Sequence, residues 1–234
     1  MSLRFASGLA LAALSALSLA ACGGSDTSST VDASIGSDGR PVAGRMLPMA
    51  VGDSWTYAVT PTGMPSVQKT STVQAFEDVG GTKAGVMAFR VRTEKVDGAT
   101  VSWQADTGTS VVRHREQVFD LAGVMTSEQY YTPSKLRVDD VHLTTGATWV
   151  DTYTEETRNV ASGVVTPIAK TETWTVEADA EAVTVPAGTF VCVRLRRTGA
   201  AGAADKRYWF SPGVGKVKEV GAGSTEELVS YTLR

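Results

Sequence analysis

The chain has 234 residues, a formal net charge of -3 and five Trp, six Tyr and six Phe residues. The small net charge excludes a nucleic-acid binder that relies on bulk positive charge, and the aromatic content excludes global disorder. The chain is therefore long enough, and apolar enough, to fold around a core.

The first 21 residues have the pattern of a bacterial secretory signal. One cation, Arg4, precedes an apolar run from Phe5 to about Ala21, which is too short for a comfortable membrane-spanning helix. The run ends in Leu-Ala-Ala-Cys at residues 19–22, which resembles the lipobox of bacterial lipoproteins at every position. The resemblance implies cleavage after Ala21 and lipidation of Cys22. An ordinary secretory signal with an unmodified Cys22 is the alternative.

Lipidation of Cys22 predicts where the protein is found. Each buried methylene contributes about 0.8 kcal/mol, so two or three acyl chains anchor a protein stably where one is marginal. Residue 23 is Gly rather than Asp, which under the common sorting rule for such lipoproteins indicates the cell outer membrane. The face of that membrane stays open.

Residues 22–45 are expected to form a flexible tether, and 46–234 a single folded domain. Gly, Ser, Asp and Thr dominate the tether, which cannot bury enough apolar surface to offset the entropy of ordering it. The sequence contains only two cysteines. With Cys22 lipidated, Cys192 is a lone thiol and the domain has no internal disulfide.

Residues 46–234 have the sequence pattern of an all-β fold. Short runs rich in Val, Thr, Tyr and Trp alternate with turns that contain Gly, Pro and Asp. The stretch EAVTVPAGTFVCVRLRR at 181–197 predicts a hairpin around Pro186–Gly188, and RYWFSPGVGKVKEV at 207–220 predicts another.

The domain also contains pairs of similar segments that occur in the same order in its two halves. VGDSWTYAVT at 51–60 matches TGATWVDTYT at 145–154, and MAFRVR at 87–92 matches VCVRLR at 191–196. We interpret these as two copies of an antiparallel meander, about 46–118 and 140–234; chance matching is the alternative. The halves are expected to join in one curved sheet or half-barrel, because such a meander must close or be covered at its edges.

Three motifs carry a resemblance across most of the mature chain: LPMAVGDSWTY at 47–57, VTVPAGTFVCVRL at 183–195 and WFSPGVGKVKEV at 209–220. In them the chain resembles a group of bacterial outer-membrane lipoproteins. Their architecture is similar to the curved half-barrel of the LolA/LolB and LppX carriers. Those carriers plug the concave face with helices, whereas no long helix is expected here.

The residues that often support catalysis are few. His114 and His142 have no identifiable third and fourth partners, so neither a metal site nor a cofactor is predicted. Cys192 is interpreted as a small residue in a half-buried slot, with a reactive thiol as the alternative. No nucleophile elbow, P-loop or HExxH motif occurs, so the chain is predicted not to be an enzyme.

Two sets of residues are candidates for ligand binding. Four arginines fall on equivalent faces of the two copies, and a tryptophan pair occupies equivalent positions: Arg90, Arg92, Arg194, Arg196, Trp103 and Trp209. Guanidinium groups on one surface suit an anionic headgroup, phosphate or glycan acid, and the tryptophans suit a sugar. The alternatives are a solvated strand face and core tryptophans.

The leading functional hypothesis is a non-enzymatic, lipid-anchored outer-membrane protein that binds or scaffolds a partner, including a lipid or other apolar ligand. The first alternative is an adhesion or assembly module that binds a protein or an anionic glycan. A hydrolase is the least supported alternative. Nucleic acid is not an expected partner.

Overall fold

A computed structural model describes residues 44–199, 205–221 and 223–234. The predicted signal peptide, its cleavage site at Ala21, the lipidation site Cys22 and the tether as far as residue 43 lie outside the described residues.

Strands make up almost all of the described chain, together with one short 3-10 turn, η1 (Gly81–Lys83). None of the helices among the described residues has the length and apolarity to cross a membrane. The strands, in chain order, are β1 (Ser54–Pro61), β2 (Val67–Asp78), β3 (Met87–Lys95), β4 (Gly98–Asp106), β5 (Ser110–Phe119), β6 (Met125–Asp139), β7 (Thr148–Asn159), β8 (Val165–Val185), β9 (Gly188–Gly199), β10 (Lys206–Ser211), β11 (Gly215–Gly221) and β12 (Ser224–Thr232).

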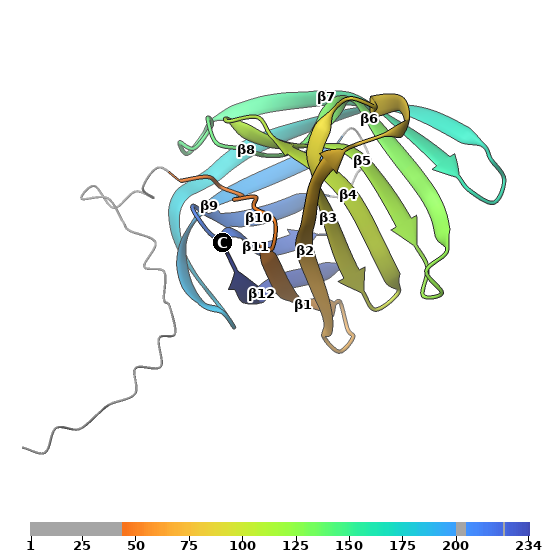
Figure 1. Cartoon of the computed structure of the whole chain (residues 1–234). Helices are drawn as coiled ribbons and strands as arrows, with labels where there is room; N and C mark the ends of the chain where they lie inside the picture. Colours follow the sequence, from red (N-terminus) through yellow and green to blue (C-terminus); the bar gives the residue numbers. More distant parts are fainter. Residues whose placement is uncertain (1–43, 200–204, 222) are drawn as a thin grey trace, which may run out of the picture. The chain divides into compact units, whose positions relative to one another are not determined.

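The strands form one closed antiparallel barrel in which each strand pairs with its neighbours in sequence (Figure 1). The prediction of an all-β antiparallel meander is confirmed. The half-barrel is wrong, because β1 pairs along its length with β12, from Ser54 opposite Thr232 to Pro61 opposite Ser224. This last pairing satisfies the backbone groups of both terminal strands, so the barrel has no free edge.

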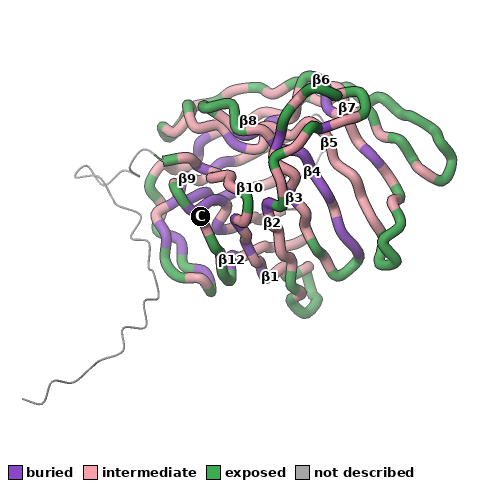
Figure 2. Tube along the Cα trace, in the orientation of Figure 1, coloured by how far each residue is buried: buried purple, intermediate pink, exposed green. Residues whose placement is uncertain are grey.

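Side-chain alternation sorts each strand into an inner and an outer face. On β4, Thr100 and Gln104 line an internal cavity, while Val101 and Trp103 point the other way. In Figure 2, buried positions recur along the strands between intermediate and exposed ones.

The two ends of the barrel are built differently. At one end the chain enters through the plug segment, residues 44–53, in which Met46 is fully buried. The other end carries the turns that follow β1, β3, β5 and β7.

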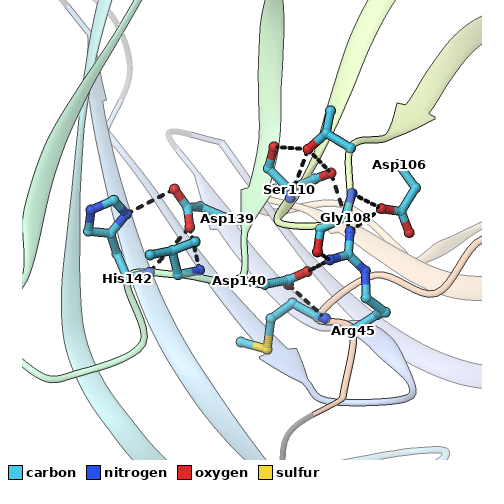
Figure 3. A network of polar contacts seen from close by, with 10 residues as sticks. Arg45, Asp106, Gly108, Ser110, Asp139, Asp140 and His142 are labelled. Atoms are coloured by element: carbon cyan, nitrogen blue, oxygen red, sulfur yellow. Dashed lines mark hydrogen bonds and ion pairs between the residues drawn. The ribbon is translucent and has the colours of Figure 1, made fainter.

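The plug segment is fixed by the polar network drawn in Figure 3. The Arg45 guanidinium pairs with the carboxylates of Asp106 and Asp140 and donates to the Gly108 carbonyl at 2.5 Å. The Met46 amide donates to Asp140 Oδ1 at 2.9 Å. Backbone and side chain of the plug are thus held by loops that follow β4 and β6.

Apolar packing is concentrated around the plug and around a folded-over hairpin. Met46 packs with Trp174, Leu195 and Phe210 in one cluster. The tip of the β8–β9 hairpin brings Cys192 against Trp209 in a second cluster, and the Ala187 amide donates to the Leu228 carbonyl at 3.0 Å. Register shifts in β8 between Val176 and Glu181 let this long hairpin leave the barrel wall.

The two members of each pair of similar sequence segments lie six strands apart. Trp55 lies on β1 and Trp149 on β7, and Trp103 lies on β4 and Trp209 on β10. The structure thus places the matched segments at equivalent positions of a twelve-strand barrel. The duplication of residues 46–118 and 140–234 stays a prediction.

Candidate functional site

A cavity of about 380 Å³ lies inside the barrel, and we call it the charged cavity. Six cationic side chains and three carboxylates line it, an excess of three positive charges. They are Lys69, Lys95, Arg113, Arg137, Lys206, Lys216, Glu116, Glu219 and Glu226. Aromatic rings complete the wall: Trp55, Tyr57, Trp174, Tyr208 and Phe210.

The cavity extends from the plug towards the opposite end of the barrel. Leu47 and Met49 of the plug segment line it at one end. Lys95, the last residue of β3, and Lys206, the first of β10, line it beside the turns at the other. The lining is therefore charged at the turn end and apolar at the plug.

Two β-bulges place charged residues three apart in sequence on the same inner face. On β11, Phe210 of β10 pairs with Lys216 and Trp209 pairs with Lys218, so Val217 is an extra residue. Lys216 and Glu219 consequently both point inward. On β5 the extra residue is His114, which leaves Arg113 and Glu116 inward.

One ion-pair network crosses four strands of the inner wall. Lys216 Nζ lies 2.5 Å from Glu219 Oε2 and 2.7 Å from Glu226 Oε2. Lys206 Nζ lies 2.6 Å from Glu219 Oε1, and Lys69 pairs with Glu226. Each glutamate is therefore shared by two lysines, which leaves the network with one more cation than carboxylates.

The charges in this network set each other's ionisation. Burial alone raises the pKa of Glu219, but the Lys216 and Lys206 ammonium groups outweigh it and hold that pKa far below its ordinary value. Burial lowers the pKa of Lys69 to about 8, helped by the charge of Lys216 and opposed by Glu226. Tyr57 stays neutral, because burial raises the pKa of its phenol.

The two arginines of the cavity differ in their partners. Arg113 pairs with Glu116. Arg137 makes no hydrogen bond and no ion pair with any residue in the described ranges, and its Nε is buried without a partner. The neighbouring Arg113 charge and burial both lower the pKa of Arg137. The residue keeps some accessible surface, and that surface faces the cavity.

A second polar cluster adjoins the aromatic wall. Glu172 accepts a hydrogen bond from the Tyr153 hydroxyl at 2.9 Å and lies 3.5 Å from Lys135 Nζ and 3.4 Å from Arg197 Nη1. The Arg197 guanidinium lies 5.6 Å from the Trp174 ring centroid. These contacts hold Trp174 in place beside the cavity.

The four arginines predicted from sequence lie on the outer face of the wall. Arg90 pairs in register with Trp103 and Arg194 with Trp209, and the residues on either side of these tryptophans, Gln104, Tyr208 and Phe210, line the cavity.

Each of these arginines has a carboxylate partner. Arg90 lies 3.8 Å from Glu77, Arg92 pairs with Glu94, Arg194 lies 3.0 Å from Glu177 and 2.7 Å from Glu181, and Arg196 lies 2.7 Å from Asp205. The structure does not gather them into one unpaired cluster, and an anion there competes with these carboxylates.

Trp103 and Trp209 are buried on the same outer face, each below a cation. The Arg115 guanidinium lies 4.5 Å from the Trp103 ring centroid, and Lys218 Nζ lies 6.0 Å from that of Trp209. Trp103 also donates to Glu77 at 3.0 Å. With 6% and 9% of their surfaces exposed, the two rings are packed and offer little open face to a sugar.

The residues considered for catalysis are held apart from the cavity. His114 Nδ1 lies 2.6 Å from the Ser134 hydroxyl, and His142 Nδ1 lies 2.9 Å from Asp139 Oδ2 with its ring stacked on Trp149. Cys192 is fully buried, and burial raises the pKa of its thiol to about 12. Within the described ranges no three His, Cys, Asp or Glu side chains are placed to hold a metal ion.

Sequence reasoning missed the cavity residues, although the sequence carries a signal for them. β5 reads SVVRHREQVF, with four consecutive ionisable residues from Arg113 to Glu116. A wall strand with ionisable residues on both faces requires a polar interior. The stretch GKVKEV on β11 carries the same signal.

Comparison with known proteins yields two partial structural likenesses. No family model and no curated protein matches the sequence. A Bacteroides fragilis protein described as exported, with a YmcC-like fold, aligns with a TM-score of 0.40 and 10% identity over 82% of this chain and 100% of its own. A Parabacteroides distasonis protein described as a lipoprotein aligns with a TM-score of 0.42 and 11% identity over 81% and 99%. Likeness at this level identifies neither a family nor a function.

Proposed function

We propose that this chain is an exported envelope protein, anchored to the outer membrane by lipid on Cys22, whose barrel holds a small polar molecule in the charged cavity. It acts as a binding protein rather than as an enzyme. The observation that carries the proposal is a cavity of about 380 Å³ inside the barrel that is lined by six cations and three carboxylates.

The size of the cavity supports this function. Pockets that bind small molecules typically measure about 300–1,000 Å³. Core packing normally excludes voids of that kind, and charged side chains are rarely turned inward unless they have partners. A volume that accommodates a polar ligand accounts for both features at once.

The lining favours a polar ligand over an acyl chain. Lys69, Arg113, Lys216, Glu219 and Glu226 all project into the cavity, and desolvating them against an aliphatic chain is costly. The cavity also has apolar surface, at the plug and along its aromatic wall, but these charged side chains interrupt it, which disfavours the apolar ligand considered from sequence.

Native mass spectrometry of the full-length protein, purified from membranes in detergent, tests the binding function. We expect a small molecule that is released on denaturation. Ser71→Phe places a ring in the cavity and removes that molecule, whereas Thr72→Phe, the next residue on β2 and on its outer face, retains it. Circular dichroism confirms that both variants fold.

Wild-type protein that carries no molecule, and that takes up none from a small-molecule extract of the producing cells, contradicts the proposal. Equal occupancy in Ser71→Phe and Thr72→Phe contradicts the location of the site.

Membrane fractionation tests the anchor separately. Wild-type protein is expected in the outer-membrane fraction, and Cys22→Ser in the soluble envelope fraction, because the acyl chains that supply the membrane affinity are absent. Unchanged partitioning of Cys22→Ser contradicts the lipid anchor on Cys22 but does not affect the proposed binding function.

A further inference from the structure

Arg137 is the exceptional residue of the charged cavity. It lies near the end of β6, beside Arg113 of β5, and lines the cavity. Its Nε is buried, and no described residue accepts a hydrogen bond from its guanidinium. The five N–H groups of its planar fork therefore have no acceptor among the described residues.

A buried guanidinium N–H without an acceptor, such as that of Arg137 Nε, is unfavourable, because it has lost its hydration without gaining a hydrogen bond. Arginine cannot relieve this by losing its proton under ordinary conditions. The cost is offset when an anion enters the cavity and accepts those hydrogen bonds.

The surroundings of Arg137 add to the attraction for an anion. The charge of Arg113 lowers the pKa of Arg137 more than burial does, so positive charge is concentrated at this part of the cavity. The carboxylates of Glu116, Glu219 and Glu226 are already engaged by Arg113 and by the three lysines of the network. Arg137 is left without a carboxylate of its own.

A further hydrogen-bond donor and two aromatic rings face the same space. The Tyr208 hydroxyl makes no hydrogen bond to any described residue, and Tyr208 and Arg137 influence each other electrostatically. Tyr208 is stacked on Trp174 at 5.6 Å between ring centroids, and Phe210 lies 6.2 Å from Tyr208. The site therefore combines oxyanion donors with a flat apolar wall.

We propose that the ligand of the charged cavity is a small molecule with a carboxylate or phosphate group, and that Arg137 binds this group through paired hydrogen bonds. This rests on the proposed binding function and names the chemistry of its ligand. Guanidinium is suited to the role because its fork matches two oxygens of a carboxylate or phosphate.

The outer arginines provide the natural contrast. Arg92 is of the same residue type and lies on β3, on the outer face of the barrel, where it pairs with Glu94. An anion at Arg92 gains one interaction by losing another, whereas an anion at Arg137 gains hydrogen bonds that the protein does not make. Arg92→Met is therefore the matched control for Arg137→Met.

Equilibrium dialysis of the full-length protein against radiolabelled inorganic phosphate, at constant ionic strength in chloride, tests the assignment. We expect saturable binding by wild type and Arg92→Met, and at least about tenfold weaker binding by Arg137→Met, because charge-assisted hydrogen bonds are lost. Arg137→Lys keeps the charge without the fork and is expected to fall between them. Competition by acetate and by succinate measures the preference for carboxylate over phosphate.

Thermal unfolding without phosphate separates a binding role from a structural one. Arg137→Met is expected to unfold at the same temperature as wild type or higher, because the substitution removes an unpaired buried charge. Added phosphate is expected to raise the unfolding temperature of wild type but not of Arg137→Met. A destabilised Arg137→Met variant that still binds phosphate overturns the assignment.

Three other results overturn it as well: equal phosphate binding by Arg137→Met and wild type, equal loss in Arg92→Met, or no binding of phosphate or of either carboxylate by wild type. A neutral molecule released in the native mass spectrometry experiment overturns the anion but leaves the cavity function standing. If the protein is empty in that experiment but phosphate binding is abolished only in Arg137→Met, the anion site at Arg137 stands and the proposed binding function falls.

Discussion

The outer and inner faces of the barrel wall carry the same types of charged residue but differ in how these residues are paired. Outside, Arg194 lies between Glu177 and Glu181. Inside, lysines outnumber the glutamates they share, and Arg137 has no acidic partner among the described residues. The outer face is locally neutral and screened by solvent, whereas the inner face retains unbalanced positive charge in a confined volume.

The contrast between the two faces separates the charged residues of structural ion pairs from those that are candidates for ligand binding. Arginines that are prominent in the sequence serve the outer surface, where ion pairs contribute little to stability. The charged residues that line the cavity are identified only from the structure, because β-bulges and closure of the barrel turn them inward.

The largest expected difference between the faces comes from two lysines on β11. Lys216→Met leaves Glu219 and Glu226 buried without their shared cation and is expected to lower the free energy of unfolding by about 3 kcal/mol or more. Lys218→Met breaks an outer pair with Glu227 and is expected to cost about 0–1 kcal/mol. Urea unfolding of both variants measures the difference, and equal effects contradict the contrast between faces.

Acid pH is expected to weaken the inner network next. Burial raises the pKa values of Glu219 and Glu226, but the lysines outweigh it, so both folded-state values lie below the ordinary 4.5. The unfolded state then binds more protons than the folded state below about pH 5, so this stability is present above the unfolded pKa and is lost as the pH falls.

Unfolding curves collected between about pH 6 and pH 3 check this dependence. Wild-type stability should fall over that range, and the fall should be shallower in Lys216→Met, which has already lost the interactions that depress the two pKa values. A slope that is identical in both proteins argues against the network as its source.

An intermediate effect is expected at the plug, where Arg45 pairs with Asp106 and Asp140. Arg45→Ala leaves Asp140 without its guanidinium and is expected to cost about 1–3 kcal/mol. Hydrogen exchange should then increase at the Met46 and Gly213 amides, which are bonded to Asp140 and to the Arg45 carbonyl. Unchanged exchange at both amides contradicts the role given to the network in Figure 3.

The smallest effect is expected on the outer face alone. Arg194→Met removes two ion pairs from the outer wall and is expected to change the free energy of unfolding by about 1 kcal/mol or less, without affecting phosphate binding. Chemical denaturation and the dialysis experiment measure the two quantities. Loss of phosphate binding in this variant would return the site to the outer arginines.

The fold class was readable from the sequence because its signals are local. Alternation along β9 and the turn residues Pro186–Gly188 identify strands and hairpins without any long-range information. Closure was not readable, because pairing of β1 with β12 joins residues that are about as far apart in sequence as the domain allows. A half-barrel and a barrel share the same alternation and the same turns.

The charged cavity could not be located by alternation alone. A period of two separates the faces of a strand but does not say which face lies inside. Lys216 and Glu219 have an odd spacing that assigns them to opposite faces in a regular strand, and only the bulge at Val217 brings them together. Arg113 and Glu116 are joined in the same way by the bulge at His114.

Anomalous X-ray diffraction from crystals of the full-length protein grown with arsenate, the heavy analogue of phosphate, locates the bound anion directly. We expect an anomalous peak inside the barrel, within hydrogen-bonding distance of the Arg137 guanidinium, that is absent in Arg137→Met crystals. Arsenate bound only at the outer arginines, or an interior peak that persists in Arg137→Met, contradicts an anion site at Arg137.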